Sequence, residues 1–277
     1  MTIRLVDSHC HLQADRLVDD LDPVVAAARD AGLARILVPG WNRRSSEGAI
    51  AVAERHPWLD VAVGVHPHDA ADVPDEAWDW FVAAAADPRV VAIGETGLDF
   101  DRAFSPPDAQ RRNLRRNLAL ALATGKPAIL HCRSANGRRD AQDALVDELV
   151  AAGVGGSAWR AAFGERPPAL IHSFSGPVDY AERVLGLGLA ISFSGLVFRA
   201  GEEASAEVVR LVPADRLLVE TDSPYLSPPG APRRRNEPAW VAITAGWVAE
   251  RRGEAPEAVG EALVGAYDRC FRVARPS

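Results

Sequence analysis

The sequence contains a single lysine, Lys126, although it has 31 basic residues in total. Any chemistry that requires a lysine side chain must therefore use this position. Cysteine is also scarce, since the three cysteines, Cys10, Cys132 and Cys270, are odd in number and widely spaced. Such a set does not suggest a disulfide framework, and it predicts a protein of the reducing cytoplasm.

An excess of positive charge is missing as well. The formal net charge is −7 and the pI is about 5.5. Proteins that hold nucleic acid through their overall charge are usually basic. A polyanionic substrate would therefore need a local source of positive charge.

No hydrophobic segment is long enough to suggest a membrane span. The longest uncharged run, residues 184–198, includes three glycines and is too short to cross a bilayer. The first seven residues lack the apolar core of a signal peptide. Apolar residues make up 48% of the chain and charged residues 25%, which excludes the disordered and fibrous classes.

Eight short apolar runs recur along the chain, with roughly thirty residues between successive runs, close to the size of a βα unit. They are nearly continuous rather than alternating, as expected for strands that are covered on both faces. The runs are Ile3–Val6, Ile36–Val38, Val61–Val65, Val90–Ile93, Ala128–Leu130, Ala169–Ile171, Leu189–Phe193 and Leu217–Val219.

Segments with helical periodicity fill the intervals between these runs. The clearest are residues 75–86, 108–124, 140–152 and 238–251. Their apolar stripes include Val82 in the first segment and Ile243 in the last. Strands that alternate with helices in this way predict an α/β fold, a single (β/α)₈ TIM barrel with residues 1–277 in one domain. Residues 134–139 and 153–168 are expected to be inserted connections.

Polar motifs follow the ends of the predicted strands. Because all strand ends of a barrel open at one mouth, these side chains are expected to meet there. Six of the seven histidines belong to this set, and only His56 lies elsewhere. The motifs are Asp7-Ser-His9-Cys-His11, Gly64-Val-His66-Pro-His68, Gly94-Glu95-Thr-Gly-Leu-Asp99, His131-Cys-Arg133, His172 and Glu220-Thr-Asp222.

The residue types at these positions predict a metal centre. His9 and His11 alternate along an extended segment, so both imidazoles point to the same side. Nitrogen and carboxylate ligands without thiolates suit Zn, Mn, Fe or Co, and also Mg where water and phosphate complete the coordination. Six donors exceed the needs of one ion and predict two. The six are His9, His11, Glu95, His131, His172 and Asp222.

Two metals about 3.5–4 Å apart can be joined by a bridging group. Some binuclear barrel hydrolases use a carboxylated lysine, but Lys126 precedes the fifth predicted strand and falls at the wrong end of the barrel. The bridge is therefore expected to be a carboxylate. Glu95, which follows the fourth predicted strand, is the best candidate.

Taken together, the motifs resemble the TatD family of metal-dependent deoxyribonucleases. The resemblance includes His172-Ser-Phe-Ser-Gly, Glu220-Thr-Asp-Ser-Pro-Tyr-Leu and Arg235-Asn-Glu-Pro238, and it extends in order from residue 7 to residue 238. It implies a barrel of the amidohydrolase type that hydrolyses phosphodiesters with divalent metal. It also implies that the six donors are metal ligands and that Glu95 is shared.

The chain departs from the family pattern in two places. The family commonly has an Asn-Ala-x-x-Leu-Phe stretch near its C-terminus, where this chain has Ala266-Tyr-Asp-Arg-Cys-Phe271. This departure concerns the packing of the last helix rather than the metals. The insertions after Arg133 and before His172 make the substrate preference less transferable than the chemistry.

Further polar residues are candidates for substrate binding. Arg133, two residues after a predicted ligand, is suited to hold a phosphate. His66 is expected either to face the mouth and touch the phosphate or to serve the turn around Pro67. Arg235, in a basic run beside Asp222, is a candidate for contact with the nucleic-acid backbone. By contrast, Asp99 and Glu220 are expected to support ligands rather than to bind metal themselves.

The predicted function is hydrolysis of DNA phosphodiester bonds by a metal-activated water, starting from a 3′ end and using two divalent ions (Mg, Mn or Zn). Asp222 would take the proton of the water, and Glu95 would join the two ions. One alternative is an ester or amide hydrolase on the same barrel, such as an aminoacyl-tRNA deacylase. Another is a non-catalytic binding protein that keeps the metals. A monomer without membrane contact is expected.

Overall fold

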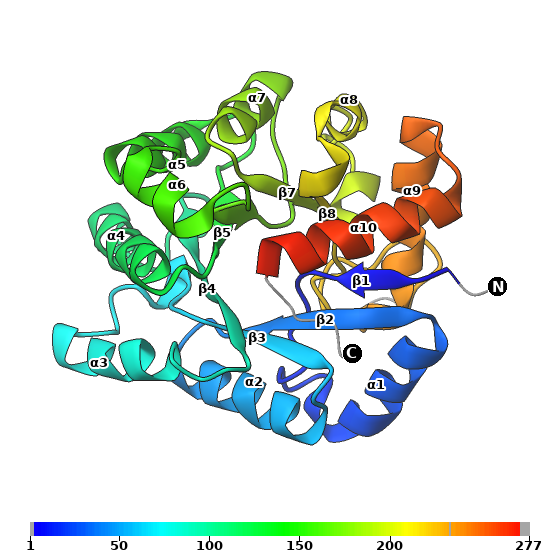
Figure 1. Cartoon of the computed structure of the whole chain (residues 1–277), viewed down its shortest axis with the longest axis horizontal. Helices are drawn as coiled ribbons and strands as arrows, with labels where there is room; N and C mark the ends of the chain where they lie inside the picture. Colours follow the sequence, from blue (N-terminus) through cyan, green and yellow to red (C-terminus); the bar gives the residue numbers. More distant parts are fainter. Residues whose placement is uncertain (1–2, 233, 272–277) are drawn as a thin grey trace.

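Eight parallel strands, paired in chain order from β1 to β8, form the centre of the protein. The computed structural model describes residues 3–232 and 234–271. The fold places the C-terminal ends of all eight strands at one mouth, and the prediction of a (β/α)₈ barrel is confirmed (Figure 1). The strands are β1 (Leu5–Asp7), β2 (Leu33–Pro39), β3 (Leu59–Val63), β4 (Val90–Asp99), β5 (Ala128–Arg133), β6 (Ala169–Ile171), β7 (Ala190–Phe193) and β8 (Leu217–Val219).

The segments that follow β8 and β1 join the two ends of this sheet. The amide of Ser8 donates to the carbonyl of Val219 at 3.0 Å. Further along, the amide of Asp222 donates to the carbonyl of His9 at 2.9 Å. The closure therefore brings together two segments that carry predicted ligands.

Helices surround the strands on the outside of the barrel (Figure 1). Two of them, α5 and α6, connect β5 to β6, and two more, α9 and α10, follow β8. The helices are α1 (Leu21–Asp30), α2 (Arg43–Arg55), α3 (Asp75–Ala84), α4 (Pro107–Thr124), α5 (Asp140–Ala151), α6 (Ser157–Phe163), α7 (Val178–Gly186), α8 (Ser205–Leu211), α9 (Val241–Arg252) and α10 (Pro256–Phe271). Short 3₁₀ turns are η1 (Val18–Asp20), η2 (Pro67–Asp69), η3 (Gly195–Phe198), η4 (Ala214–Arg216) and η5 (Pro238–Trp240).

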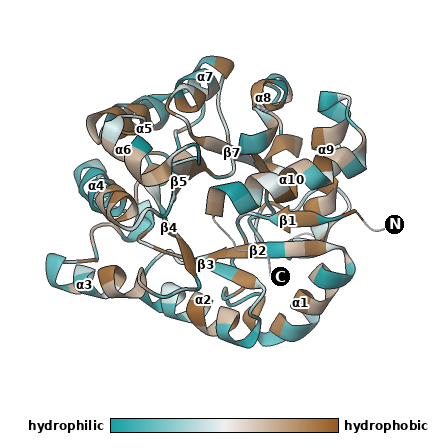
Figure 2. Ribbon diagram, in the orientation of Figure 1, coloured by the Kyte–Doolittle hydropathy of each residue, from teal (hydrophilic) through white to brown (hydrophobic). Residues whose placement is uncertain are grey.

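The core lies between the strands and the inner faces of these helices. The strands are hydrophobic along most of their length, whereas the helices carry hydrophilic residues on their outer sides (Figure 2). All five residues of β3 are buried, as are all residues of β7. This burial on both faces explains why the strand sequences are continuous rather than alternating.

Helix α10 covers the N-terminal end of the barrel, opposite the mouth. The hydroxyl of Tyr267, which is fully buried, donates to Oδ2 of Asp60 at 2.9 Å. Asp60 also lies 3.5 Å from the guanidinium of Arg35. The C-terminal segment that departs from the family pattern therefore serves the packing of the last helix, as predicted.

Residues 153–168, predicted to be an inserted connection, lead from α5 to β6, and they contain α6, which buries Trp159 and Phe163. Two other local predictions were wrong. Val82 is 47% exposed and Ile243 is 37% exposed, although their spacing placed both on buried stripes. In α3 only Phe81 is buried, so that stripe is narrower than its periodicity suggests.

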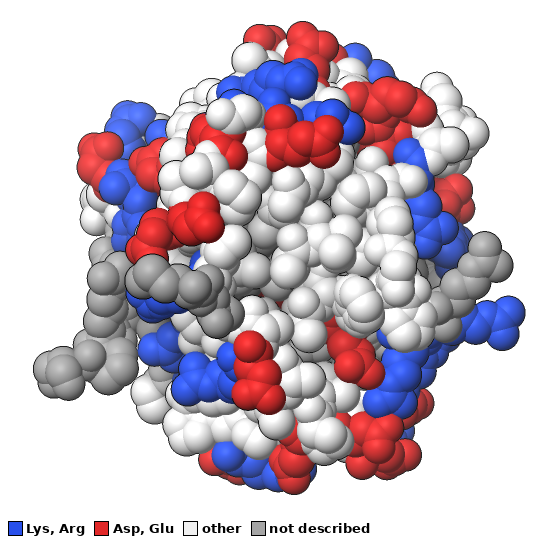
Figure 3. Space-filling model, turned by 90° about the vertical axis from the view of Figure 1, so that its right-hand side faces the viewer, with Lys and Arg blue, Asp and Glu red and all other residues white. Residues whose placement is uncertain are grey.

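Charge is dispersed over one face of the molecule. On the face shown in Figure 3, basic and acidic side chains lie close together around an uncharged centre. That face therefore offers no extended basic surface to a polyanion. Among the described helices, none is both long and apolar enough to cross a membrane.

Candidate active site

The first pair of predicted ligands follows β1 directly. Asp7, at the end of this strand, accepts hydrogen bonds from the amides of His9 and Thr221. Cys10 is fully buried in the barrel wall, so His9 and His11 project together into the mouth. Their Nε2 atoms lie 3.1 Å apart.

Glycines allow Glu95 to sit inside the barrel rather than beyond its edge. Gly94 and Gly97 have φ values of +143° and +141°, a region that side chains rarely tolerate. A Cβ on Gly97 would collide with the backbone of His131, and one on Gly94 would lie 2.7 Å from the carbonyl oxygen of Ile129. The chain around Glu95 therefore packs directly against β5.

The two oxygens of Glu95 face different groups of histidines. Oε2 lies 3.3 Å from Nε2 of His9 and 3.7 Å from Nε2 of His11. Oε1 faces the other group, at 2.9 Å from His172, 3.1 Å from His131 and 3.3 Å from His66. One carboxylate thus stands between two sets of nitrogen donors, as a bridging ligand must.

Asp222 lies beside the first of these two groups. Its Oδ1 is 3.5 Å from Nε2 of His11 and 3.8 Å from Nε2 of His9. The side chain of Asp222 is 15% exposed, compared with 4% for that of Glu95. Asp222 is therefore the more accessible of the two carboxylates from the mouth.

Asn236, which belongs to one of the sequence motifs, positions the loop that carries Asp222. Its side-chain amide is buried and donates to the carbonyls of Thr221 and Tyr225, each at 2.8 Å. These bonds fix the chain on both sides of Asp222, whose φ is +54°. The motif around Asn236 is visible in the sequence, but its residues alone do not indicate this role.

Two more carboxylates support the histidines from behind. Oδ2 of Asp99 lies 2.7 Å from Nε2 of His68 and 3.3 Å from Nε2 of His131. Glu220 is fully buried and faces Nδ1 of His172 at 3.1 Å. These contacts orient the imidazoles, which is the supporting arrangement that the sequence suggested for both acids.

Burial opposes a charge on the imidazoles of the site, but neighbouring carboxylates outweigh it at His11 and His172 and raise the pKa of both. Burial lowers the pKa of His66 to about 3 and also lowers that of His9. Burial opposes the ionisation of Glu95, but the neighbouring histidines, His172 first, hold the pKa of its carboxyl well below the ordinary value. Burial likewise opposes ionisation of Asp222, and its contact with His11 nevertheless lowers the pKa.

The donors form three overlapping sets whose ligand atoms lie within 4.8 Å of one another. Each set combines imidazole nitrogens with one carboxylate oxygen, which suits divalent transition metals. Lys126 contributes nothing here, because its ammonium donates to the carbonyls of Ala85 and Asp87 near the start of β5. The sets are His9, His172 and Asp222; His9, His11 and Glu95; and His66, Glu95 and His131.

The three predicted substrate-binding residues are placed differently. His66 is buried within the cluster around Glu95. Arg133 stands at the rim, where its side chain is 40% exposed and lies 3.9 Å from Asp99. Arg235 is held away from the centre, because its guanidinium pairs with Asp20 at 2.8 Å and with Glu237 at 2.9 Å. Arg233, the first residue of the run Arg233-Arg234-Arg235, lies outside the described residues.

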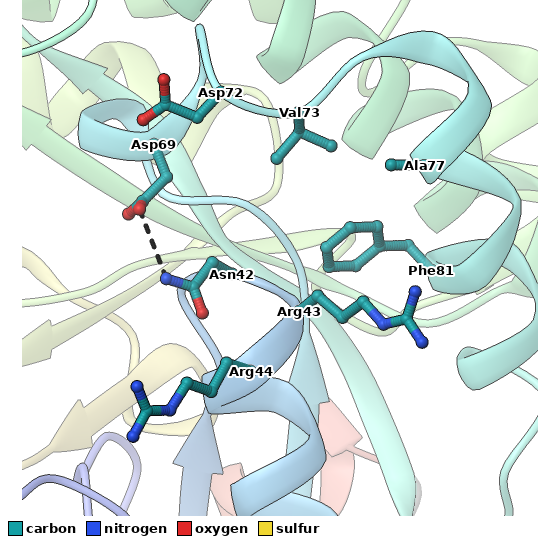
Figure 4. A pocket seen from close by; sticks show the side chains of 8 residues that line it. All are labelled: Asn42, Arg43, Arg44, Asp69, Asp72, Val73, Ala77 and Phe81. Carbon is teal, nitrogen blue, oxygen red and sulfur yellow. Dashed lines mark hydrogen bonds between the residues drawn. The ribbon is translucent and has the colours of Figure 1, made fainter.

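A separate cavity of about 280 Å³ lies beside the N-terminus of α2 (Figure 4). The guanidinium groups of Arg43 and Arg44 point in different directions there. Arg43 pairs with Glu47 at 2.9 Å, and Asp69 accepts a bond from Asn42 at 3.3 Å. Because its cations do not converge and its acids are mixed among them, this cavity does not form an anion site.

Comparison with known proteins places the whole chain among one set of relatives. Residues 6–272 match the family described as TatD related DNase. The chain is 37% identical to the 3′-5′ ssDNA/RNA exonuclease TatD of Erwinia billingiae, over 97% of this chain and 99% of that protein. It is 34% identical to the uncharacterized metal-dependent hydrolase YabD of Bacillus subtilis, again over 97% of this chain and 99% of its relative.

Solved structures agree with this assignment. The crystal structure of YjjV, a TatD homolog from Escherichia coli K12, superposes with a TM-score of 0.86 and 27% identity. The alignment covers 99% of this chain and all of that one. A TatD family hydrolase from Entamoeba histolytica has the same fold, with a TM-score of 0.83 at 20% identity and coverage of 98% and 99%.

Proposed function

Because the chain belongs to the TatD-related DNase family, we propose that it removes nucleotides from the 3′ ends of single-stranded nucleic acid. The family resemblance read from the motifs is confirmed, and with it the prediction of a metal-dependent hydrolase of phosphodiester bonds. The direction of cleavage and the single-stranded substrate are proposed from the name of the Erwinia relative.

The observation that carries the mechanism is the position of Glu95. Its oxygen Oε2 faces His9, and its oxygen Oε1 faces His172, so the two oxygens face two different groups of imidazoles. We propose two divalent ions, with His9, His11 and Asp222 on one side and His131 and His172 on the other. When bound, such ions supply Lewis acidity at the phosphate and lower the pKa of water.

Asp222 is proposed to take the proton from the attacking water. It is the most exposed carboxylate of the donor set, and its lowered pKa keeps it ionised at neutral pH. The water oxygen would form a bond to phosphorus as the bond to the 3′ oxygen breaks, and one proton of the water would pass to a carboxylate oxygen of Asp222. The 3′ oxygen would leave with the electron pair of the broken bond and take a proton from solvent, which gives the shortened strand a 3′ hydroxyl.

Arg133 and His66 are proposed to orient the scissile phosphate. Arg133 is a partly exposed cation beside the buried Asp99, which keeps its guanidinium at the rim. This local charge would compensate for the overall acidity of the chain. A phosphate fits this cation better than the neutral carbonyl of an ester or amide does.

We also propose that residues 1–277 act as one domain, that the protein is a monomer, and that it works in the cytoplasm. The last proposal rests on the three cysteines, which are free and widely separated.

The proposed activity can be tested with short oligonucleotides labelled at the 5′ end. Single-stranded DNA, single-stranded RNA and duplex DNA are incubated with Mg, Mn or Zn and resolved on a gel. We expect a ladder that shortens from the 3′ end of the single strands and is absent for Glu95→Gln. Internal cleavage without a ladder, or no cleavage with any metal, would contradict the proposal.

Metal analysis of the same proteins tests the two-ion model. After equilibration with saturating Mn and removal of free ions, wild-type protein should retain two ions per chain. Glu95→Gln should retain fewer than two, because both groups lose a shared charged ligand. One ion or none in the wild-type protein would exclude the binuclear arrangement.

A further inference from the structure

Two aromatic rings stand exposed at the mouth of the barrel. Most large hydrophobic side chains that are exposed among the described residues are aliphatic and scattered. The exceptions are Phe104, which is 68% exposed, and Tyr225, which is 48% exposed. The aliphatic ones are Val18, Val82, Val150, Leu211 and Ile243.

Each of these two rings contacts a histidine of the candidate active site. The ring centroid of Phe104 lies 4.7 Å from that of His68, and the ring of Tyr225 lies 6.0 Å from that of His11. Exposed aromatic residues are costly in contact with water. Their placement at the mouth, rather than elsewhere on the surface, indicates a role in binding.

The two rings lead through different histidines to different oxygens of Glu95. In the first chain of contacts, Phe104 contacts His68, which contacts His66 at 4.2 Å, and His66 faces Oε1. In the second, Tyr225 contacts His11, which faces Oε2. A phosphate bound next to Glu95 would therefore have one exposed aromatic ring along each of these two chains of contacts.

The backbone beneath both rings is fixed. Ser105, next to Phe104, donates its hydroxyl to the carbonyl of His68 at 2.8 Å and accepts from Gln110 at its own carbonyl, also at 2.8 Å. The carbonyl of Tyr225 is held by the buried Asn236. Rings on fixed loops can receive a planar partner without first becoming ordered.

A cation lies against the Tyr225 ring, and a second cation lies at the end of a chain of contacts that leads through Asp99 and His68 to Phe104. The guanidinium of Arg16 lies 5.6 Å from the centre of the Tyr225 ring, and that of Arg133 lies beside Asp99, which bonds to His68. Asp101 and Arg102, which precede Phe104 by three and two positions, are charged and exposed. A single ring among charges suits a base with its phosphate better than it suits the broad apolar surface of a protein partner.

We propose that Phe104 and Tyr225 are stacking platforms for unpaired nucleobases on the two sides of the scissile phosphate. This inference rests on the proposed function and explains the preference for single strands in physical terms. Bases in a duplex are stacked on their neighbours and cannot lie on these rings. Because stacking does not involve the sugar, DNA and RNA should be bound in the same way.

The test compares a short oligothymidylate with the same strand carrying an abasic site, either at the 3′-terminal nucleotide or at the one before it. For wild-type enzyme we expect each abasic strand to raise KM by about 5- to 150-fold, as expected for the loss of one stacked base. Phe104→Ala should raise KM for the intact strand and remove one of the two abasic effects. Tyr225→Ala should remove the other.

Matched variants separate stacking from structural damage. Phe104→Trp and Tyr225→Phe keep an aromatic ring and should retain both abasic effects on KM. Phe104→Leu keeps an apolar side chain but no ring, and it should lose one of the two abasic effects. Val150→Ala, which shortens an exposed aliphatic residue on α5, serves as the control for loss of apolar surface. The ratio of KM for the abasic strand to KM for the intact strand should be the same for oligouridylate as for oligothymidylate.

The outcomes distinguish this proposal from the function on which it rests. If wild-type enzyme cleaves the intact and abasic strands with the same KM, the stacking proposal is wrong and the exonuclease proposal stands. Abasic effects that persist unchanged in both alanine variants would also overturn the stacking proposal. If wild-type enzyme cleaves no nucleic acid with any metal, both proposals fail.

Discussion

Nδ1 of His172 lies 3.1 Å from Oε1 of Glu220, a fully buried carboxylate. This contact leaves Nε2 of His172 free to face Glu95 at 2.9 Å. Burial opposes a charge on His172, but Glu95 and Glu220 together raise its pKa well above the ordinary value. Glu220 therefore orients a predicted ligand and, together with Glu95, raises its basicity.

We expect Glu220→Gln to weaken metal binding by about tenfold and Glu220→Ala by up to about 100-fold. The glutamine can still accept the Nδ1 proton but lacks the charge, and the alanine lacks both. Calorimetric titration with Mn measures these affinities, with Glu261→Gln on the surface of α10 as the control. Unchanged affinity in both Glu220 variants would show that His172 needs no orienting group.

Asp222→Asn should reduce turnover by roughly 10²- to 10⁴-fold even at saturating metal, because an amide cannot accept the proton of the water. The amide oxygen can still serve as a ligand, so a second ion should bind at higher metal concentration. Single-turnover cleavage across a Mn titration provides the measurement. Full recovery of the rate in excess Mn would mean that Asp222 is a ligand only.

Arg133→Ala should lower kcat by roughly 10²-fold, because a cation at the rim is worth most when charge builds up on the phosphate. Arg133→Lys should recover only part of this loss, since an ammonium lacks the planar pair of donors. Steady-state kinetics on single-stranded DNA measure both variants. An effect on KM alone would remove Arg133 from the reacting phosphate.

Arg235 provides the comparison for Arg133. Its guanidinium is already paired with Asp20 and Glu237. Arg235→Ala should therefore change KM by less than about fivefold, the range of an exposed ion pair. A larger rise in KM that disappears at high salt would restore Arg235 as a contact to the nucleic-acid backbone.

Asp60, at the opposite end of the barrel, should make stability depend on pH. Burial raises the pKa of its carboxyl to about 6, despite Arg35 and the hydroxyl of Tyr267. The folded protein thus binds this proton more tightly than the unfolded chain does. As the pH rises from 4 to 7, the free energy of unfolding should therefore fall, by about 2 kcal/mol from this group.

Asp60→Asn removes the titrating group but keeps an oxygen for Tyr267. Urea unfolding at pH 4 and pH 7 should show a smaller fall for this variant than for the wild-type protein. Asp79→Asn, at an exposed position on α3, is the control. Equal pH dependence in the wild-type and Asp60→Asn proteins would contradict the assignment.

The sequence could predict the barrel and the meeting of its polar residues, because parallel strands all end at one mouth. Once His9, Glu95 and His172 were placed at strand ends, their proximity followed from topology. The metal and catalytic roles of these residues stay predictions. The division of the two Glu95 oxygens between two histidine groups depends on side-chain packing and could not be read from spacing.

Other features depend on contacts between residues far apart in the chain. The pairing of Arg235 with Asp20 spans 215 positions, so no local pattern reports it. The exposure of Phe104 is equally hidden, since a phenylalanine is ordinarily expected to be buried. Tyr225 lies within the motif Glu220-Thr-Asp-Ser-Pro-Tyr-Leu. Its position shortly after Asp222 could have indicated that its ring lies at the mouth.

The concentration of six histidines at one end of the barrel has a practical consequence for spectroscopy. Only His56 lies elsewhere, where it faces Asp22 at 3.0 Å on the surface. In a nuclear magnetic resonance spectrum, nearly every imidazole signal would therefore originate from the mouth, and His56 would be an internal reference. A paramagnetic ion such as Mn²⁺ would broaden the signals of the mouth while sparing that one, so ring resonances alone could follow the loading of the site.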